Sequence, residues 1–285
     1  MKRISEKGIR RILTATAFSA IAALTLIVIF ILMEGLPFIF RAGLNNFLFS
    51  SEWDPQSQKF GILPMVAGSL WVTLGAVIVG VPLGISGAIF LSEFVPRWLM
   101  RIIKPTIELL AGIPSVVYGF IGVMVLAPLI RNHLGGPGLS ILAASIILGI
   151  MILPTILSIS IDSIKAVPNS FREGALALGA THWQTIHMVT LPAAKSGIVA
   201  GIILGLGRAI GETMAVIMVV GNAVKIPGSP LDSARTLTAN IALEMGYATG
   251  MHRQSLFATG VILLVIIMIL NYIAIMAMRN IGRIK

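Results

Sequence analysis

The sequence contains no cysteine and few charged residues. Without cysteine, the chain has no disulfide bond, no thiolate nucleophile and no zinc–thiolate site. Charged residues make up 11% of the 285 residues and hydrophobic residues 56%, with a mean hydropathy of +0.97. A soluble domain carries about 25% charged residues. The composition therefore predicts an integral membrane protein with the lipid bilayer as its solvent.

Motifs for catalysis and for cofactor binding are also lacking. The sequence has no G-x-x-x-x-G-K-[ST] loop to hold ATP phosphates and no G-x-S-x-G nucleophile motif. The closest histidines, His182 and His187, are five residues apart, which does not bring both rings onto one helical face, and no carboxylate completes a metal site. We therefore expect no enzyme activity, no catalytic residue, no metal site and no cofactor bound by this chain.

Six apolar stretches are long enough to cross a bilayer, which takes about 20 residues as a helix. The first exceeds the roughly 7–15 apolar residues of a signal peptide, and no A-x-A cleavage site follows it, so we interpret it as a retained helix. The expected fold class is all-α, a polytopic membrane protein with six transmembrane helices. The expected spans are residues 12–33, 62–91, 105–130, 139–161, 197–222 and 255–278.

The distribution of Lys and Arg predicts the orientation. With six spans, both termini lie on one side of the membrane, together with loops 92–104 and 162–196. That side carries fourteen Lys and Arg residues and the other side carries six. The positive-inside rule therefore places both termini in the cytoplasm of a multi-pass protein of the cell membrane. Because the net charge of +10 is explained in this way, we expect no nucleic-acid partner.

Proline and glycine interrupt several spans at membrane depth. A broken helix is tolerated in a bilayer only where neighbouring protein or a water-filled cavity satisfies the freed backbone groups. Pro114 frees a carbonyl near Leu110, beside which Ser115 and Tyr118 either line a substrate pathway or satisfy the kink. Glu108 is expected in the first turn of its span, where the helix dipole stabilises a carboxylate. We expect a packed bundle with an internal path.

The cytoplasmic loop predicts two short helices. Ser170 and Glu173 have the spacing of a capping box, and Gly179 is a natural stop for the helix that they begin. Thr181 and Gln184 repeat the capping signature before a second helical piece. An apolar stripe on the first helix fits a partner's groove, and the alternatives are contact with lipid headgroups and packing beneath the bundle. This stripe consists of Phe171, Ala175 and Leu178.

The same loop carries a known family pattern. Glu173-Gly174-Ala175, then Gly179, then Leu191-Pro192 resemble the E-A-A-x-x-x-G…L-P loop of ABC-type importer permeases. In that family the loop is the coupling helix, which sits in a cleft of the ATPase subunit. The chain departs from the pattern at Gly174, where alanine is usual, and at Val189, where isoleucine is usual. The resemblance implies the type I importer permease fold.

Three further stretches resemble the phosphate-specific importers, and within one of them GETMAV, at 211–216, is more similar to their C-type permease than to the A-type partner. The three stretches are LAGIPSVVYGF at 110–120, GRAIGETMAV at 207–216 and WDP…FG at 53–61. The resemblance implies a second homologous permease subunit, a dimer of ATP-binding subunits that holds the ATP, and an extracytoplasmic phosphate-binding protein.

The chain is expected to have two parts. Residues 1–61 form an N-terminal transmembrane helix and the first extracytoplasmic loop, and residues 62–280 form the permease domain with coupling loop 162–196. The outer loops 34–61 and 223–254 are expected to receive the binding protein. Trp53 in the first of these loops is, as an alternative, an anchor at the membrane interface.

Two charged residues interrupt the fifth apolar span. Arg208 and Glu212 are four residues apart and are expected to share a helical face at mid-membrane. The glycine stripe Gly197, Gly201 and Gly205 continues that face and permits either close helix packing or an open cavity. The guanidinium fork suits an oxyanion, and the carboxylate would partly neutralise it and prevent trapping. The alternative is a structural ion pair between spans.

The expected function is therefore that of a permease subunit of an ATP-driven phosphate importer, which forms the translocation path with a second permease. The alternatives are a stand-alone secondary anion transporter or channel, an ABC permease for another oxyanion, and a membrane scaffold without transport activity. A secondary transporter has no reason to carry the coupling loop and would be expected to show inverted repeats, which the sequence does not display.

Overall fold

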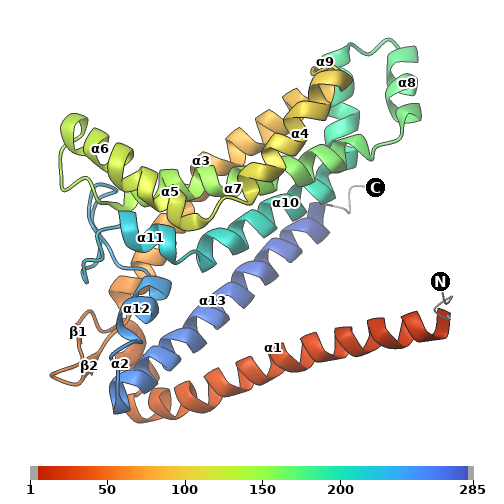
Figure 1. The fold of residues 1–285 in the computed structure, drawn as a ribbon. Helices are drawn as coiled ribbons and strands as arrows, with labels where there is room; N and C mark the ends of the chain where they lie inside the picture. Colours follow the sequence, from red (N-terminus) through yellow and green to blue (C-terminus); the bar gives the residue numbers. More distant parts are fainter. Residues whose placement is uncertain (1–5, 282–285) are drawn as a thin grey trace.

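The computed structural model describes residues 6–281, which are mostly helical (Figure 1). Two π-helical turns, η1 (Gly122–Leu126) and η2 (Ile186–Thr190), join α5 to α6 and α9 to α10. The helices are α1 (Glu6–Ala42), α2 (Leu44–Phe49), α3 (Leu63–Glu93), α4 (Arg97–Ala111), α5 (Ser115–Ile121), α6 (Ala127–His133), α7 (Ile141–Lys165), α8 (Asn169–Ala177), α9 (His182–Thr185), α10 (Leu191–Gly211), α11 (Met214–Val219), α12 (Leu237–Glu244) and α13 (Gly250–Ile281).

Within the described residues, 6 helical segments are long and apolar enough to cross a membrane, which confirms the predicted number of spans. They are Gly8–Ala42, Leu63–Glu93, Ser115–His133, Ile141–Lys165, His182–Gly211 and Gly250–Ile273.

The third predicted span, 105–130, has the wrong boundary. Helix α4 begins after Pro96 and contains Pro105, and the membrane-length segment begins only at Ser115, after a break before Pro114. The residue before a proline is disfavoured in helical conformation, which ends α4 early. Glu108 consequently lies near the C-terminal end of α4, so its predicted stabilisation in a first helical turn is wrong.

The fifth predicted span, 197–222, begins and ends too late. Segments α9, η2 and α10 are continuous from His182 to Gly211, so the second short helix of the cytoplasmic loop is part of the span. Pro192 does not break the helix because it lies at the first turn of α10, directly after the wider π-helical turn. The helix ends instead at Gly211, where Glu212 turns to extended backbone.

Helix α7 is the centre of the bundle, flanked by α3 and α10 (Figure 1). Gly80 and Gly84 of α3 face Ile152 and Ile156 of α7, and a Cβ atom on either glycine would lie 2.8 or 2.7 Å from an isoleucine carbon. The glycine stripe of α10 packs on α7 in the same way. Small residues therefore let the helices approach closely, as in other membrane bundles, and the stripe forms a contact and not an open cavity.

A second core lies at the end of the molecule away from α8 (Figure 1). Here the C-terminal part of α1 packs on α13, with α2 and a short antiparallel hairpin, β1 (Trp53–Asp54) and β2 (Lys59–Phe60), that sequence analysis did not predict. Residues of both predicted parts of the chain share this core, and the division at residue 61 stays a prediction. The core includes Phe38, Phe47, Phe60, Met65, Leu237 and Val261.

The beginning of α1, the α8–α9 region and the end of α13 lie at one end of the molecule, opposite the hairpin and α12 (Figure 1). This arrangement agrees with termini on the same side of a membrane. Four of the basic residues used to predict which side is cytoplasmic lie outside the described residues: Lys2, Arg3, Arg283 and Lys285. The assignment of that side remains a prediction.

Candidate functional site

Arg208 lies where three helices meet. Its Nη2 donates to the carbonyl of Ala111, the last residue of α4, over 3.3 Å, and its Nη1 donates to Thr155 Oγ1 of α7 over 3.5 Å. Thr155 is near the middle of the membrane-length helix α7, so Arg208 lies at membrane depth. Both hydrogen bonds are longer than the usual 2.7–3.2 Å, and the side chain is only partly buried. The guanidinium therefore retains donor capacity.

The backbone is irregular on two sides of Arg208. Helix α4 ends at Ala111 and α5 starts at Ser115, while α10 ends at Gly211 and α11 starts at Met214. A Cβ atom built on Gly207 or Gly211 would have no neighbour within 4 Å, so the flanks of Arg208 on α10 are open. Irregular backbone at membrane depth is tolerated only beside protein or a water-filled cavity. The region therefore has the character of a binding or pathway site.

Glu212 does not pair with Arg208, so the ion pair that the sequence allowed as an alternative does not form. Helix α10 ends at Gly211; Glu212 keeps a helical φ of −68°, and its ψ of 130° turns the chain that follows it toward α11. Among the described residues, no ion pair joins them. Glu212 Oε1 instead accepts from the N–H of Ala215 over 3.1 Å, and its backbone carbonyl accepts from Thr238 Oγ1 over 3.0 Å. Glu212 thus stabilises the start of α11.

Tyr118 satisfies the break between α4 and α5. Its ring is buried, and its hydroxyl donates to the carbonyl of Leu110 over 2.9 Å. This is the structural alternative that the sequence left open, and it leaves the pathway role of Tyr118 untested. Ser115 is the first residue of α5 and is partly exposed. Tyr118 and Arg208 together bind the last two carbonyls of α4, those of Leu110 and Ala111.

Helix α8 projects from the bundle and has no buried residue (Figure 1). The predicted capping box of Ser170 and Glu173 does not form, because Pro168 is the N-cap and α8 starts one residue before Ser170. The predicted stop at Gly179 is confirmed: it has φ +87°, and the amide of Ala180 donates to the carbonyl of Ala175 over 3.1 Å. The second capping box, between Thr181 and Gln184, is also confirmed.

The side chains expected to dock a partner are accessible in this chain. Phe171 is 54% exposed and Leu178 is 92% exposed. Glu173 and Gly174 are exposed, and Ala175 is half-buried. Of the remaining residues of the family pattern, Leu191 packs against the core beneath α8 and Pro192 is exposed at the start of α10.

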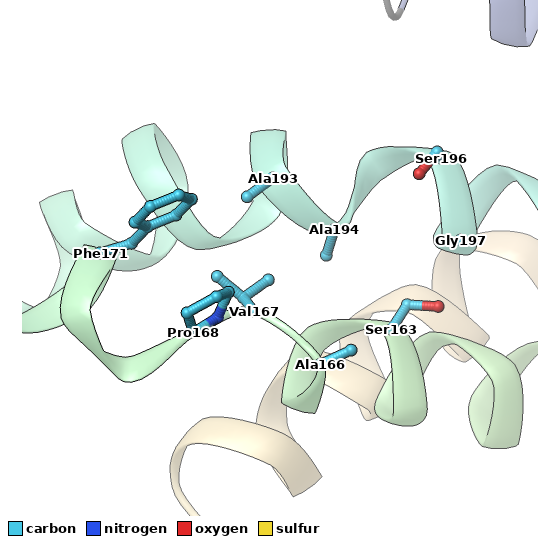
Figure 2. Close-up of a pocket in the computed structure, with 9 residues that line it drawn as sticks. All are labelled: Ser163, Ala166, Val167, Pro168, Phe171, Ala193, Ala194, Ser196 and Gly197. Carbon is cyan, nitrogen blue, oxygen red and sulfur yellow. The ribbon is translucent and has the colours of Figure 1, made fainter.

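A pocket of about 310 Å³ lies beside α8. Figure 2 shows Phe171 at one end of it, with Val167 and Pro168 on one wall and the small side chains of Ala193 and Ala194 on the other. The pocket lies between the first turn of α8 and the beginning of α10, next to the point where Gly197 of α10 packs closely on Ser163 of α7.

At the opposite end of the molecule, a network centred on Glu244 was missed by sequence analysis. Its side chain is 9% exposed and binds Arg235 Nη1 over 2.6 Å, His252 Nε2 over 2.8 Å and Trp53 Nε1 over 2.9 Å. Trp53 is thus held within the protein by the network. Trp53 lies in β1, Arg235 in the loop before α12 and His252 in α13, so no motif spacing in the sequence signals the cluster. Within residues 6–281, no group of three or more metal-ligating side chains forms a metal site.

Comparison with known proteins identifies the family. The model of the binding-protein-dependent transport system inner membrane component matches residues 80–283. The chain belongs to this family. It is 44% identical to the probable ABC transporter permease protein YqgH of Bacillus subtilis, over 96% of this chain and 92% of the relative. It is 39% identical to the phosphate transport system permease protein PstC of Mesorhizobium japonicum, over 92% of this chain and 89% of the relative.

Solved structures of permeases share the fold. A bacterial alginate ABC transporter, crystallised with its pentasaccharide-bound periplasmic protein, has a chain that aligns with a TM-score of 0.66 at 17% identity, over 99% of both chains. The MetNI methionine ABC transporter, in an inward-facing form, aligns with a TM-score of 0.58 at 21% identity, over 78% of this permease and 95% of that chain. The permease is therefore a multi-pass membrane protein with the type I ABC importer fold.

Proposed function

We propose that this permease is one membrane subunit of an ATP-driven importer of inorganic phosphate. The observation that carries the proposal is the 39% identity, over 92% of the chain, to a phosphate transport permease. A second homologous permease completes the translocation path, a dimer of ATP-binding subunits supplies the energy, and an extracytoplasmic phosphate-binding protein delivers the substrate.

ATP is bound by the partner subunits and not by this permease. The chain has no G-x-x-x-x-G-K-[ST] loop, whose backbone amides would hold the phosphates. The exposed helix α8 offers a surface for an ATPase, because its apolar and small side chains are not used within the chain. Contact with lipid headgroups would instead call for a strongly basic polar face. The α8 end of the molecule is accordingly cytoplasmic, and the hairpin end is extracytoplasmic.

Arg208 is the proposed contact for phosphate. A guanidinium donates two parallel hydrogen bonds to an oxyanion, and the long bonds to Ala111 and Thr155 are easily exchanged for shorter ones. Glu212 lies at the break between α10 and α11 and provides a carboxylate that accepts from a phosphate O–H, which fully ionised sulfate lacks. Ser115 and Tyr118 lie at the start of α5, after the break between α4 and α5, and complete the proposed pathway.

Transport by the reconstituted complex tests the proposal. The permease is co-purified with its second permease and ATPase subunits, placed in vesicles with ATP and the binding protein, and given labelled phosphate or sulfate. We expect ATP-dependent uptake of phosphate and little uptake of sulfate. A preference for sulfate would favour another oxyanion, and uptake by this chain without an ATPase would favour a secondary transporter.

A further inference from the structure

Among the described residues, one ion pair joins the exposed helix α8 to the transmembrane bundle. Arg172 lies in the first turn of the helix, and its Nη2 donates to Glu93 Oε1 of α3 over 2.9 Å and to the carbonyl of Ile164 of α7 over 3.0 Å. One guanidinium thus contacts the C-terminal turns of two transmembrane helices. Since no residue of α8 is buried, apolar packing contributes little to its position.

The Arg172–Glu93 ion pair is largely buried, and its contribution to stability does not explain that burial. The side chain of Glu93 is only 5% exposed and that of Arg172 is 25% exposed. Removing both charges from water costs about as much as their attraction returns, so a buried pair is a poor source of stability compared with apolar packing. It does, however, define one geometry, because either charge left without the other is unfavourable. The pair therefore acts on position more than on stability.

The guanidinium is also incompletely satisfied. Arg172 Nε is buried and has no hydrogen-bond partner among the described residues. A buried donor without a partner is unfavourable, so this arrangement is not the best that the side chain can make. A contact of this kind is suited to a part that changes geometry during a cycle. The pocket of about 310 Å³ beside Phe171 gives α8 space in which to shift (Figure 2).

The end of α3 is in contact with both short helices that follow α7. Beside the Arg172–Glu93 pair, the ring of Phe94 meets that of His182 in α9 edge to face, with centroids 5.7 Å apart. From this end α3 runs the length of the bundle to the hairpin end (Figure 1), where Ser69 Oγ accepts from the N–H of Leu237 over 2.9 Å. A displacement of α8 or α9 would therefore act on α3, which extends to the hairpin end of the molecule.

We propose that Arg172 and Glu93 form the positioning contact that transmits movement of α8 to the transmembrane helix α3. The inference rests on the proposed function, because it requires an ATPase that moves α8. Arg172 is a positioning residue: it contacts neither substrate nor nucleotide. Loss of either partner leaves α8 folded and docked but lets it move without α3, so ATP is hydrolysed with less transport.

The test measures phosphate transported per ATP hydrolysed by the assembled complex in vesicles, normalised to the amount of complex. For Arg172→Gln and for Glu93→Gln we expect the ratio to fall about tenfold, since a buried charge loses its partner. The double variant should fall no further than either single variant, because both remove the same contact. A ratio equal to that of the wild type, or additive losses in the double variant, would overturn the proposal.

Two milder variants keep the test decisive if the first ones do not assemble. Glu93→Asp keeps the charge but shortens the side chain by one methylene, and Arg172→Lys keeps the charge but loses the fork that reaches Glu93 and Ile164 together. We expect a severalfold fall in the ratio for both. If both variants assemble and couple as well as the wild type, the contact does not transmit movement.

The chain offers a matched control at the same end of the molecule. Lys104 Nζ and Asp162 Oδ1 form an ion pair of 2.6 Å between α4 and α7, with no part of α8 involved. Lys104→Gln should leave the ratio unchanged, and an equal fall there would show a general effect of charge and defeat the proposal. Failure of the wild-type complex to transport phosphate at all would count against the proposed function and not against this contact.

Discussion

Arg208 and Glu212 are four residues apart, but the end of helix α10 lies between them and they do not pair. Arg208 binds the carbonyl of Ala111 and the hydroxyl of Thr155, whereas Glu212 binds the amide of Ala215. Arg208 therefore supports the break between α4 and α5, whereas Glu212 supports the break between α10 and α11. Because the two residues have different partners, substitutions at each can be tested independently for their effect on transport.

Substitutions at these two positions test the proposed pathway. Arg208→Lys keeps the charge but loses the bidentate fork, so we expect phosphate uptake per assembled complex to fall about tenfold or more. Glu212→Gln should lower turnover while leaving phosphate entry less affected. Because the residues do not pair, the exchange Arg208→Glu with Glu212→Arg should not restore uptake. Near-normal uptake per complex in both single variants would leave these residues only a structural role.

The Glu244 network is expected to stabilise the hairpin end. Glu244→Gln removes the charge that compensates the partly buried Arg235, and we expect it to lower the free energy of unfolding by about 3 kcal/mol. Thermal unfolding of the purified permease in detergent measures the change. The control is Glu52→Gln, whose partner Lys59 is solvent-exposed, and no measurable change is expected there. Equal effects of the two substitutions would contradict the assigned role of the network.

Two glycines in and directly after α8 should respond in opposite ways to alanine. A Cβ atom meets no neighbour within 4 Å at either Gly174 or Gly179, so only the backbone distinguishes them. Gly179 has φ +87°, and Gly179→Ala should destabilise the end of α8 by about 1–2 kcal/mol. Gly174 lies within the helix, and Gly174→Ala should stabilise it by up to about 1 kcal/mol. Hydrogen exchange of the α8 amides tests both; protection that changes in the same direction would be inconsistent with this account.

Tyr118 is expected to stabilise the break between α4 and α5. Tyr118→Phe leaves the carbonyl of Leu110 without the hydroxyl donor and should lower the free energy of unfolding by about 1 kcal/mol. Tyr272→Phe is the control, because Tyr272 is 63% exposed on α13. Thermal unfolding should distinguish the two variants. An unchanged stability of Tyr118→Phe would show that the Tyr118 hydroxyl does not stabilise the break.

The orientation is tested by single cysteines in the naturally cysteine-free chain. Ser57→Cys lies in the exposed hairpin, and Leu178→Cys lies at the end of α8. In intact cells, a membrane-impermeant thiol reagent should label position 57 and should label position 178 only after the membrane is opened. Labelling of position 57 from the cytoplasmic side alone would reverse the proposed orientation.

The sequence by itself determined the membrane class, the number of spans and the end of α8. Apolar run length is a local property that the thickness of a bilayer selects directly, and only glycine adopts the positive φ of position 179 without strain. Local rules also failed where another local feature competed. Pro168 is the N-cap of α8, so the capping box of Ser170 and Glu173 does not form. The η2 turn lies directly before Pro192, and the helix continues through that proline.

Only the tertiary structure decided which polar groups meet. Arg208 with Ala111, Arg172 with Glu93, and Glu244 with Trp53 join residues 79–191 positions apart in the chain. Buried polar groups must find partners, but sequence spacing carries no information about partners on other helices. The ending of α10 before Glu212 is likewise set by its surroundings, since Thr238 and Ala215 bind the residue there. Span number follows from the solvent that each segment requires, whereas the polar contacts follow from how the spans pack.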